Sequence, residues 1–406
     1  MEWKEVRLGD IADVQTGPFG SQLHKSDYIA EGIPCIMPTN IGPHLNFIVD
    51  GIAHVSEVDA NRLSRHLTEI GDIIYARRGD IEKCAYVTTN EEKWLCGTGC
   101  LKIRCNNEVN SRFIAYLLST AECKKWITGN AVGTTMLNLS KGILSNLPLL
   151  VPSHEDQRRI ASILSSLDRK IELNNKINAD LEEMAQAIFK NWFVDFEPFK
   201  DGKFVDSELG KIPEGWKVGR LTDIIKLMPG GTPKTSEPLY WDNGTIPFFS
   251  PKDVNGVYCF ATEKHITETG LNKCSSNLYP KDTIFITCRG TVGKVCLAAC
   301  DMAMNQSNYA IRAIDGYSQY YVFFLVKSVV ERLIKKSNGA VFSAITSKDF
   351  DEEILIPSQK AVEDFTNVID GFFRRIFTIG TENSRLSLLR DTLLPRLMSG
   401  EIEVLE

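Results

Sequence analysis

The stretch RRIASILSSLDRKIELNNKIN, from Arg158 to Asn178, decides the fold because it predicts a long helix between two regions of globular composition. Apolar residues recur along it at the spacing of a coiled-coil seam. One row is Ile160, Leu167, Asn174, Leu181 and Ile188, and a second is Leu164, Ile171, Asn178 and Ala185. The polar Asn174 in such a seam is expected to fix the register of two paired helices at some cost in stability.

A second seam lies near the end of the chain. Its rows are Phe365, Phe372, Ile379, Leu386 and Leu393, and Val362, Ile369, Ile376, Asn383, Arg390 and Leu397. Gly380 is expected to loosen this helix, and Pro395 to end or kink it. Each helix would span roughly 45–55 Å at about 1.5 Å per residue. A buried core helix is the alternative for either seam alone, but two matching seams favour an antiparallel pair.

The chain also repeats itself. The stretch WKEVRLGDIADVQTGPFGSQ at Trp3 matches WKVGRLTDIIKLMPGGTPKT at Trp216, 213 positions later. The same offset relates Leu8 to Leu221, Asp10 to Asp223, Ile11 to Ile224 and Gly17 to Gly230. Later, GDIIYARRG resembles KDTIFITCRG, and each reads as a strand that ends in a basic residue and a glycine. Ser153 and Ser358 are expected to cap the two long helices.

These patterns predict an α/β (α+β) protein with an internal pseudo-twofold repeat. Two globular domains would be separated by two long antiparallel helices that form a coiled coil. The expected parts are a first domain over 1–153, a central spacer helix over 154–195, a linker over 196–215, a second domain over 216–357 and a C-terminal spacer helix over 358–406. A duplicated module on a fixed spacer suits the reading of two sites a set distance apart, as on DNA.

Composition narrows the class of protein. The 406 residues are 43% hydrophobic and carry a formal net charge of −6, which argues against broad, nonspecific coating of nucleic acid. An acidic balance leaves room for local basic patches or for a basic protein partner. We find neither a run of eighteen uncharged apolar residues nor an apolar leader after Met1, so we expect a cytosolic protein.

The 11 cysteines are expected to be free thiols, mostly in the core. Cys96/Cys100 and Cys296/Cys300 are spaced as C-x3-C without a histidine near them, unlike the usual zinc spacing. A metal site is therefore not expected.

Several stretches carry a resemblance to a known family. They are W-x4-L-x-D-I at Trp3, VPSHEDQRRIASILSSLDRKIE at Val151, IFKNWFVDFEPF at Ile188, GKIPEGW at Gly210 and LLPRLMSGEI at Leu393. Together the chain resembles the specificity subunit of type I restriction–modification systems. The resemblance implies that each recognition domain reads one half of a bipartite double-stranded DNA target. It also implies that the paired helices set the gap and dock two methyltransferase subunits, and that restriction subunits join the complex to cleave DNA.

The motifs of the expected partner enzymes are missing from the sequence. Phe196-Glu197-Pro198-Phe199 lacks the amide and second proline of an adenine methyltransferase loop, and no phosphate-binding G-x4-G-K-[ST] loop occurs. We therefore expect a prokaryotic, cytoplasmic, non-catalytic subunit. S-adenosylmethionine, ATP and Mg²⁺ would be bound by its partners.

Candidate DNA contacts are polar or basic residues in glycine-flanked loops, because such side chains read base edges or grip phosphates. They are Gln15, Ser21, Gln22, Lys25, Asn40, Arg77, Arg78, Lys83 and Thr134 in the first domain, and Thr232, Lys234, Thr235, Lys252, Arg289, Lys294, Asn305 and Gln306 in the second. Arg78 and Arg289 recur in both halves and suit phosphate contacts. Positions that differ between the halves, such as Gln22 against Thr235, better suit base reading.

Two further readings stay open. Phe193, Phe196 and Phe199 are candidates for partner packing, although a buried junction fits them equally well. An adaptor that uses the same helices to bind two proteins without reading DNA is the alternative function.

Overall fold

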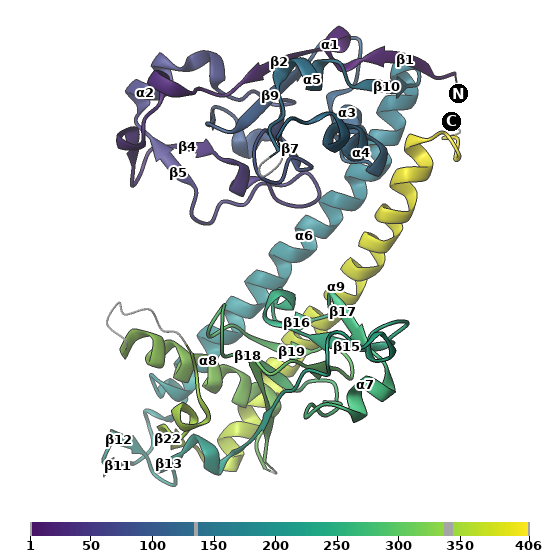
Figure 1. The fold of residues 1–406 in the computed structure, drawn as a ribbon. Helices are drawn as coiled ribbons and strands as arrows, with labels where there is room; N and C mark the ends of the chain where they lie inside the picture. Colours follow the sequence, from purple (N-terminus) through teal and green to yellow (C-terminus); the bar gives the residue numbers. More distant parts are fainter. Residues whose placement is uncertain (1, 134–136, 315, 337–343, 405–406) are drawn as a thin grey trace. The chain divides into compact units, whose positions relative to one another are not determined.

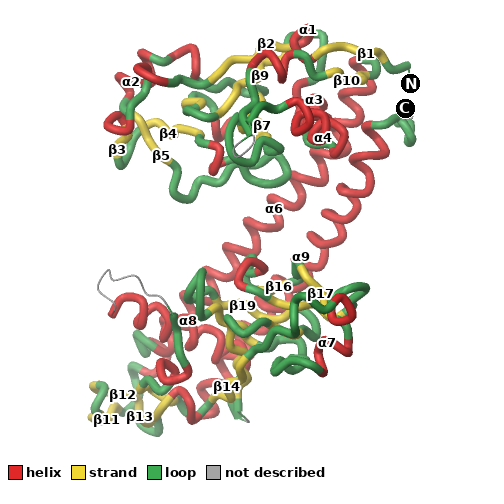
Figure 2. The backbone as a smooth tube through the Cα atoms, in the orientation of Figure 1, coloured by secondary structure: helices red, strands yellow, loops and turns green. Residues whose placement is uncertain are grey.

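The computed structural model describes residues 2–133, 137–314, 316–336 and 344–404 (Figure 1). The chain divides into two compact units. Unit 1 comprises Met1–Lys170 and Leu386–Glu406, and unit 2 comprises Ile171–Arg385. Each unit is a mixed α/β structure that contains one end of each long helix (Figure 2). Within the described residues, no helix is both long and apolar enough to cross a membrane.

Unit 1 is built on two four-stranded sheets with the orders β2-β9-β6-β7 and β3-β5-β4-β8, and on the pair β1-β10. Its strands are β1 (Lys4–Arg7), β2 (Ala12–Thr16), β3 (Tyr28–Ile29), β4 (Ile33–Ile36), β5 (Ala53–Val55), β6 (Ile73–Ala76), β7 (Cys84–Tyr86), β8 (Leu95–Cys96), β9 (Cys100–Cys105) and β10 (Pro148–Val151). Its shorter helices are α1 (Leu8–Ile11), α2 (Glu57–Arg62), α3 (Ser111–Leu118), α4 (Ala121–Asn130) and α5 (Lys141–Ser145).

Unit 2 repeats this plan, with sheets β14-β21-β18-β19-β16 and β17-β15-β20 and with the pairs β13-β22 and β11-β12. Its strands are β11 (Phe204–Ser207), β12 (Gly210–Pro213), β13 (Lys217–Arg220), β14 (Ile225–Pro229), β15 (Ile246–Phe249), β16 (Tyr258–Cys259), β17 (Lys264–Ile266), β18 (Ile284–Thr287), β19 (Val295–Ala298), β20 (Ala303–Met304), β21 (Asn308–Ala313) and β22 (Glu353–Ile356). Its shorter helices are α7 (Glu268–Asn272) and α8 (Gln319–Lys336).

The repeated sequence at the start of each half has a structural cause. Leu8 and Leu221 are both fully buried. A carboxylate oxygen of Asp10 accepts a hydrogen bond from the backbone N of Arg7 at 3.0 Å, and Asp223 does the same for Arg220 at 2.8 Å. The motif therefore places one apolar anchor and one capping carboxylate at the same turn of each unit.

The two predicted spacer helices are present as α6 (His154–Phe193) and α9 (Gln359–Met398). The start of α6 and the end of α9 belong to unit 1, whereas the end of α6 and the start of α9 belong to unit 2, so the helices run antiparallel. The predicted caps are confirmed, because the Ser153 hydroxyl accepts from the N of Asp156 at 3.2 Å and the Ser358 hydroxyl from the N of Ala361 at 3.3 Å.

Several seam residues are buried as the heptad pattern predicts, although Phe373 is buried in place of the neighbouring Phe372, which is only half-buried. Ile160 and Leu164 are fully buried in unit 1, and Phe365 and Ile369 are fully buried in unit 2. Asn174 is also buried, and its amide nitrogen donates to the side-chain oxygen of Asn383 at 2.8 Å. The α/β fold with a two-helix antiparallel coiled coil is therefore confirmed. The residue limits proposed for the recognition domains stay predictions.

Pro395 and Gly380 both lie inside α9. Pro395 does not end the helix at its own position, because α9 continues to Met398 and this last turn buries Leu397 and Met398 in unit 1. A kink at Pro395 and a looser helix at Gly380 stay predictions. A Cβ at Gly380 would stand 2.1 Å from the ring of Phe260, so the glycine makes room for the domain that packs on α9 within unit 2.

Candidate nucleic-acid interface

Three loops, two of which carry candidate residues, meet at one edge of the main sheet of unit 1. Loop A (residues 17–25) follows β2, loop B (97–99) precedes β9 and loop C (77–83) follows β6. Because β9 pairs antiparallel with both β2 and β6, the end of β2, the start of β9 and the end of β6 lie at the same edge. The sequence therefore concentrates its glycine-flanked polar segments at a single surface.

Hydrogen bonds join these loops in unit 1. The Thr98 hydroxyl of loop B donates to the carbonyl oxygen of Pro18 in loop A at 2.7 Å. The backbone N of Arg77 in loop C donates to the carbonyl of Gly99 at 2.8 Å, and the N of Leu139 donates to the carbonyl of Arg77 at 2.9 Å. Loops A, B and C thus form a connected surface rather than three independent loops.

Unit 2 has the same edge, with loop A at 230–238, loop B at 305–307 and loop C at 288–294. Here the Thr232 hydroxyl of loop A donates to the side-chain oxygen of Gln306 in loop B. The backbone N of Cys288 donates to the carbonyl of Ser307 at 2.8 Å, and the N of Ile345 donates to the carbonyl of Cys288 at 3.0 Å. Two residues of the predicted site, Thr232 and Gln306, are therefore in direct contact.

Loop C carries the basic residues that recur in both halves. Arg78 and Arg289 are exposed, and each precedes a glycine, Gly79 or Gly290, whose φ is 77°. Such a backbone angle favours glycine and gives both turns the same shape. Lys83 and Lys294 lie at the other end of the turn, where their carbonyl oxygens accept from the N of Ala76 and of Thr287, each at 2.9 Å.

The two domains thus present equivalent pairs of cations, Arg78 with Lys83 and Arg289 with Lys294. Lys83 also lies 3.2 Å from Asp80, an exposed ion pair that contributes little to stability. Four of the predicted residues therefore form one repeated, solvent-facing feature. A feature common to both halves suits contacts to the uniform phosphate backbone.

Loop A differs between the units. In unit 1, Lys25 is exposed, whereas Gln22 is half-buried and its side-chain oxygen lacks a hydrogen-bond partner. In unit 2, Lys234 and Thr235 are both exposed. The side chain of Ser21 is not described, and Thr134 lies outside the described residues. Among the described residues of the edge, those of loop A therefore differ most between the two units in the hydrogen-bond donors that they expose.

Asn40 is a wrong prediction. It is buried, its side-chain oxygen accepts from the N of Met37 at 2.9 Å, and its amide nitrogen donates to the carbonyl of Ile48 at 3.0 Å. Both polar atoms therefore hold the Pro38–Asn40 turn. Asp253, 213 positions later, caps the matching turn by accepting from the N of Ser250 at 2.7 Å. Lys252 on that second turn is exposed, and its Nζ lies 3.9 Å from a carboxylate oxygen of Glu263.

Three other predicted residues, Asn305, Gln15 and Arg77, have structural roles in unit 1 or unit 2. Asn305 accepts from the N of Ser307 at 2.9 Å and from the amide of Asn308 at 2.7 Å, so it shapes loop B. Gln15 lies within β2 opposite Lys102, before loop A begins. Arg77 is half-buried, and its backbone, rather than its side chain, makes the contacts described above.

Sequence reasoning missed Thr98, the residue that ties loop B to loop A in unit 1. It lies 208 positions before Gln306, which was identified in the second half. The same offset relates β9 to β21, so extending the repeat through these strands is the signal that could have found Thr98.

The three aromatic candidates for partner packing lie inside unit 2. Phe193 is buried, with ring centroids 4.8 Å from Tyr321 and 4.9 Å from Phe365. Phe196 and Phe199 both pack on the ring of Trp216, at 5.4 and 5.2 Å. These contacts match the buried-junction reading and leave Phe193 unavailable to a partner.

The cysteines lie mainly in the core. Burial raises the pKa of the Cys96 thiol, and of the Cys259 thiol, to about 12, so both are protonated at neutral pH. Among the described residues, no three His, Cys, Asp or Glu side chains come together in a geometry that could hold a metal ion.

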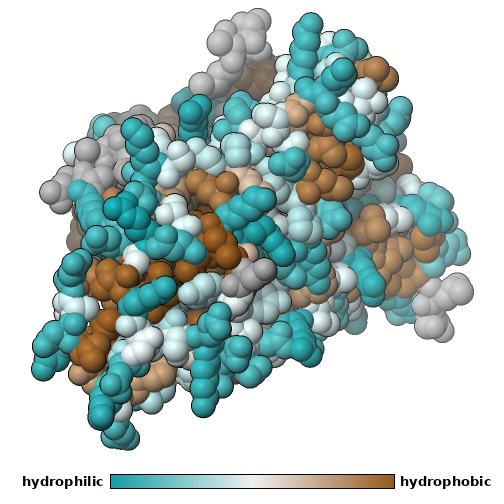
Figure 3. All heavy atoms as spheres, turned by 90° about the horizontal axis from the view of Figure 1, so that it is seen from below, coloured by the Kyte–Doolittle hydropathy of each residue, from teal (hydrophilic) through white to brown (hydrophobic). Residues whose placement is uncertain are grey.

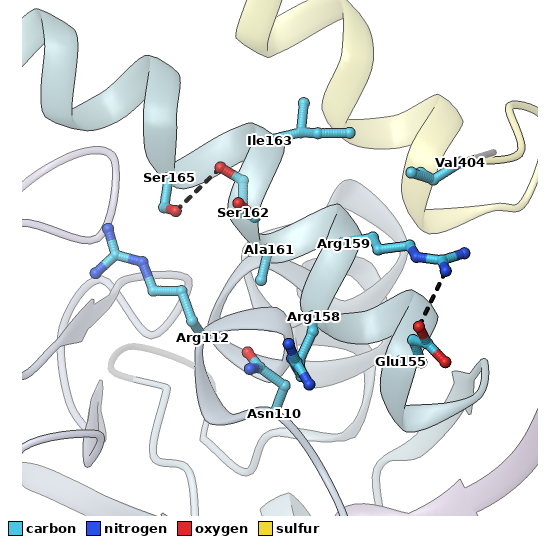
Figure 4. Close-up of a pocket in the computed structure, with 10 residues that line it drawn as sticks. All are labelled: Asn110, Arg112, Glu155, Arg158, Arg159, Ala161, Ser162, Ile163, Ser165 and Val404. Carbon is cyan, nitrogen blue, oxygen red and sulfur yellow. Dashed lines mark hydrogen bonds and ion pairs between the residues drawn. The ribbon is translucent and has the colours of Figure 1, made fainter. Parts of the chain in front are cut away.

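A cavity of about 640 Å³ in unit 1 is lined by residues of α3 and α6 but by none of the predicted DNA contacts (Figure 4). Arg112, Arg158 and Arg159 line it, yet their guanidinium groups point in different directions in Figure 4. Arg159 pairs with Glu155 at 3.0 Å, and Arg112 lies 4.4 Å from the ring centroid of Tyr86. The three cations therefore do not converge on one ligand.

Comparison with known proteins agrees with this duplicated architecture. The profile of the type I restriction modification DNA specificity domain matches residues 1–183 and 213–374, once for each half of the chain. The chain belongs to this family, whose members supply DNA recognition rather than catalysis.

Relatives match over nearly the whole chain. The type I restriction enzyme MjaIX specificity subunit of Methanocaldococcus jannaschii is 28% identical over 100% of this chain and 94% of its own length. The type I restriction enzyme HindI specificity subunit of Haemophilus influenzae is 28% identical over 99% and 100%. The crystal structure of the type I restriction–modification S subunit from M. genitalium has a TM-score of 0.58, with 16% identity, 98% coverage of this chain and 96% of that chain, which supports the fold.

Proposed function

We propose that this chain reads a bipartite double-stranded DNA sequence for a type I restriction–modification complex, with one half-site read by each unit. The observation that carries the proposal is the repeated sheet edge, in which an equivalent backbone hydrogen bond joins loops B and C in both units and a different side-chain hydrogen bond joins loops A and B in each. A protein that reads two half-sites needs two surfaces that share a backbone arrangement and differ in their side chains.

Within each edge we assign different roles to the loops. The cations of loop C grip phosphates, because Arg78 and Arg289 are exposed at equivalent positions. Loop A, together with the Thr232–Gln306 contact in unit 2, reads bases, since amide and hydroxyl groups form directional hydrogen bonds to base edges. The net charge of −6 makes these local cations, rather than a basic surface, responsible for the attraction to DNA.

We further propose that α6 and α9 set the gap between the half-sites and dock two methyltransferase subunits. Exposed apolar side chains support a docking role. Leu173, Met184 and Val194 are each more than half exposed in unit 2, outside the coiled-coil seam. Figure 3 shows hydrophobic patches between hydrophilic side chains on the face that it draws. Restriction subunits would join through the same complex, in the cytoplasm of a prokaryote.

Cofactor chemistry belongs to the partners in this proposal. S-adenosylmethionine would be bound by the methyltransferase subunits, and ATP and Mg²⁺ by subunits that move along or cleave DNA. The residues of this chain then act by binding and orienting DNA.

Methylation mapping tests the proposal directly. The chain is co-expressed with the methyltransferase encoded beside it in a host without DNA methylation, and modified bases are sequenced. We expect one motif of two short half-sites separated by a fixed, unspecified gap. Replacing residues 216–357 with the second domain of a relative should change one half-site and leave the other unchanged.

Two results would contradict the proposal. If the complex forms but methylates without a motif, the adaptor function replaces DNA reading. If replacing one domain alters both half-sites, the units do not read independently. Binding assays at two salt concentrations serve as a control, because an adaptor without DNA contacts lacks the salt dependence of phosphate binding.

A further inference from the structure

A buried ion pair joins the two long helices within unit 1. Arg390 of α9 donates from Nη1 to Oδ1 of Asp168 on α6 at 3.1 Å, and the two side chains are only 5% and 11% exposed. The Tyr116 hydroxyl of α3 donates to the other oxygen of Asp168. Arg390 also lies 3.3 Å from Nε2 of His44 and pairs with Asp391. The charges are therefore enclosed by partners from three parts of the unit.

The internal repeat identifies the matching positions in unit 2. The helix caps Ser153 and Ser358 are 205 positions apart, and this offset relates Asp168 to Phe373 and Ala185 to Arg390. The strands β9 and β21, and the helices that follow them, are 208 positions apart, which relates Tyr116 to Phe324.

At these positions unit 2 is entirely apolar. Phe373 and Ala185 are buried in its core, and the ring centroids of Phe324 and Phe373 are 5.7 Å apart. The contact between Tyr116 and Asp168 in unit 1 thus has an aromatic counterpart in unit 2. The same site on the helix pair is charged in one unit and apolar in the other.

This asymmetry has a consequence for pairing between copies of the chain. Because the halves are duplicates, α6 of one copy has the seam needed to pair with α6 of another. In that arrangement Asp168 would face Ala185 of the second copy. If α9 paired with α9, Arg390 would face Phe373. Either arrangement buries a charge without its partner, which is strongly unfavourable.

We propose that Asp168 and Arg390 are a pairing determinant, which makes the first half of this chain select the second half over a further copy of itself. The asparagines of the seam act in the same direction. Asn174 of α6 donates to Glu382 and to Asn383 of α9, each at 2.8 Å. The repeat relates Glu382 to Ile177, so a self-paired α6 would lose the bond to Glu382. It also relates Asn174 to Ile379, so a self-paired α9 would set Asn383 against an apolar side chain. The inference does not depend on which DNA is read.

Reciprocal charge variants of the full chain test the proposal. One copy carries Asp168→Arg and the other Arg390→Asp, with different affinity tags. Each alone places like charges at the buried site. When the two copies are together, α6 of each copy can pair with α9 of the other, with the linker at 196–215 as the crossover. Each position 168 then faces a position 390 of opposite charge. After co-expression we expect at least tenfold more of the second copy on the first tag than wild type shows, and a dimeric mass by light scattering.

Matched controls separate pairing from general damage. Two tagged copies of the same charge variant should capture each other no more than wild-type copies do. A single chain with both changes, Asp168→Arg and Arg390→Asp, should fold as a monomer like the wild type. If that double variant folds but the reciprocal variants show only wild-type capture, the proposal is wrong.

A second measurement decides the case without introducing new charges. The triple variant Tyr116→Phe, Asp168→Phe and Arg390→Ala gives unit 1 the residues that unit 2 already uses. Differently tagged copies are refolded together from denaturant at high concentration. We expect at least a tenfold rise in self-capture over wild type. Capture at the wild-type level would show that the ion pair does not reject self-pairing and would overturn the proposal.

Discussion

Gly17 and Gly230 occupy the same position in two separate domains. A Cβ built on Gly17 would stand 2.1 Å from the carbonyl oxygen of Gly97, and one built on Gly230 would stand 2.1 Å from that of Asn305. In both cases the backbone at the start of loop A lies directly against loop B. The glycine is needed for close approach, and the approach is what joins the loops into one surface.

The variant Gly230→Ala should therefore disturb the edge of unit 2. We expect a loss of roughly 1–3 kcal/mol in unfolding free energy, because the added methyl group meets backbone rather than a movable side chain. Methylation should become less specific at the second half-site only. Gly17→Ala should have the same effect at the first half-site only. Gly129→Ala in α4 is the control, since its Cβ would meet no atom within 4 Å. Equal losses in both variants and the control would contradict this explanation.

The variant Arg289→Ala should weaken DNA binding without changing the recognised sequence. Removing one phosphate contact reduces the slope of log affinity against log salt by about one. The measurement is a titration of labelled DNA at several salt concentrations with the assembled complex. Lys211→Ala removes an exposed charge from β12, away from the loops, and should leave the slope unchanged. A changed motif with an unchanged slope would assign Arg289 to base reading instead.

Two glycines of α9 should respond in opposite directions. Gly371→Ala meets no atom within 4 Å and should stabilise the chain by up to about 1 kcal/mol through helix propensity. Gly380→Ala should destabilise it by roughly 1–3 kcal/mol, because Phe260 must move. Urea unfolding of both variants gives the comparison. Stabilisation by both would mean that the Phe260 ring adapts without cost.

Acid should destabilise unit 1 through His66. Burial lowers the pKa of this histidine to about 4, and its Nε2 accepts from Nε of Arg65 at 2.9 Å, which requires the neutral ring. The unfolded chain takes up a proton near pH 6.5 and the folded chain does not, so stability is present above pH 6.5 and is lost as pH falls towards 4.

The loss attributable to His66 is up to about 3 kcal/mol between those pH values. His66→Gln keeps an acceptor for Arg65 without the titration, so its stability should change less between pH 6.5 and pH 5. Exposed His265→Gln is the control and should retain the wild-type slope. An unchanged slope in His66→Gln would assign the acid sensitivity to other groups.

The heptad rows and the internal repeat predicted the long helices and the duplicated domains correctly. The heptad rows gave the long helices because packing of a seam depends on regular spacing, which a sequence displays directly. Repeated glycines marked loops A and C for a similar reason, since Gly79 and Gly290 share a backbone angle that few other residues adopt.

Contacts between distant segments limited the prediction of the site. An asparagine that reads DNA and one that holds a turn look alike in sequence, and only the burial of Asn40 shows which it is. Thr98 gains its place from a bond to Pro18, 80 positions away. The asymmetry between Asp168 and Phe373 likewise appears only when the repeat is aligned through the structure rather than by residue similarity.

The division of unit 1 between both ends of the chain affects how the protein is made. Its core includes Leu397 and Met398, so this domain cannot be completed before these two residues have left the ribosome. Unit 2, formed by Ile171–Arg385, is available earlier although it comes second in the sequence. A premature stop near residue 386 therefore removes part of the core of the first domain and leaves the residues of the second domain complete.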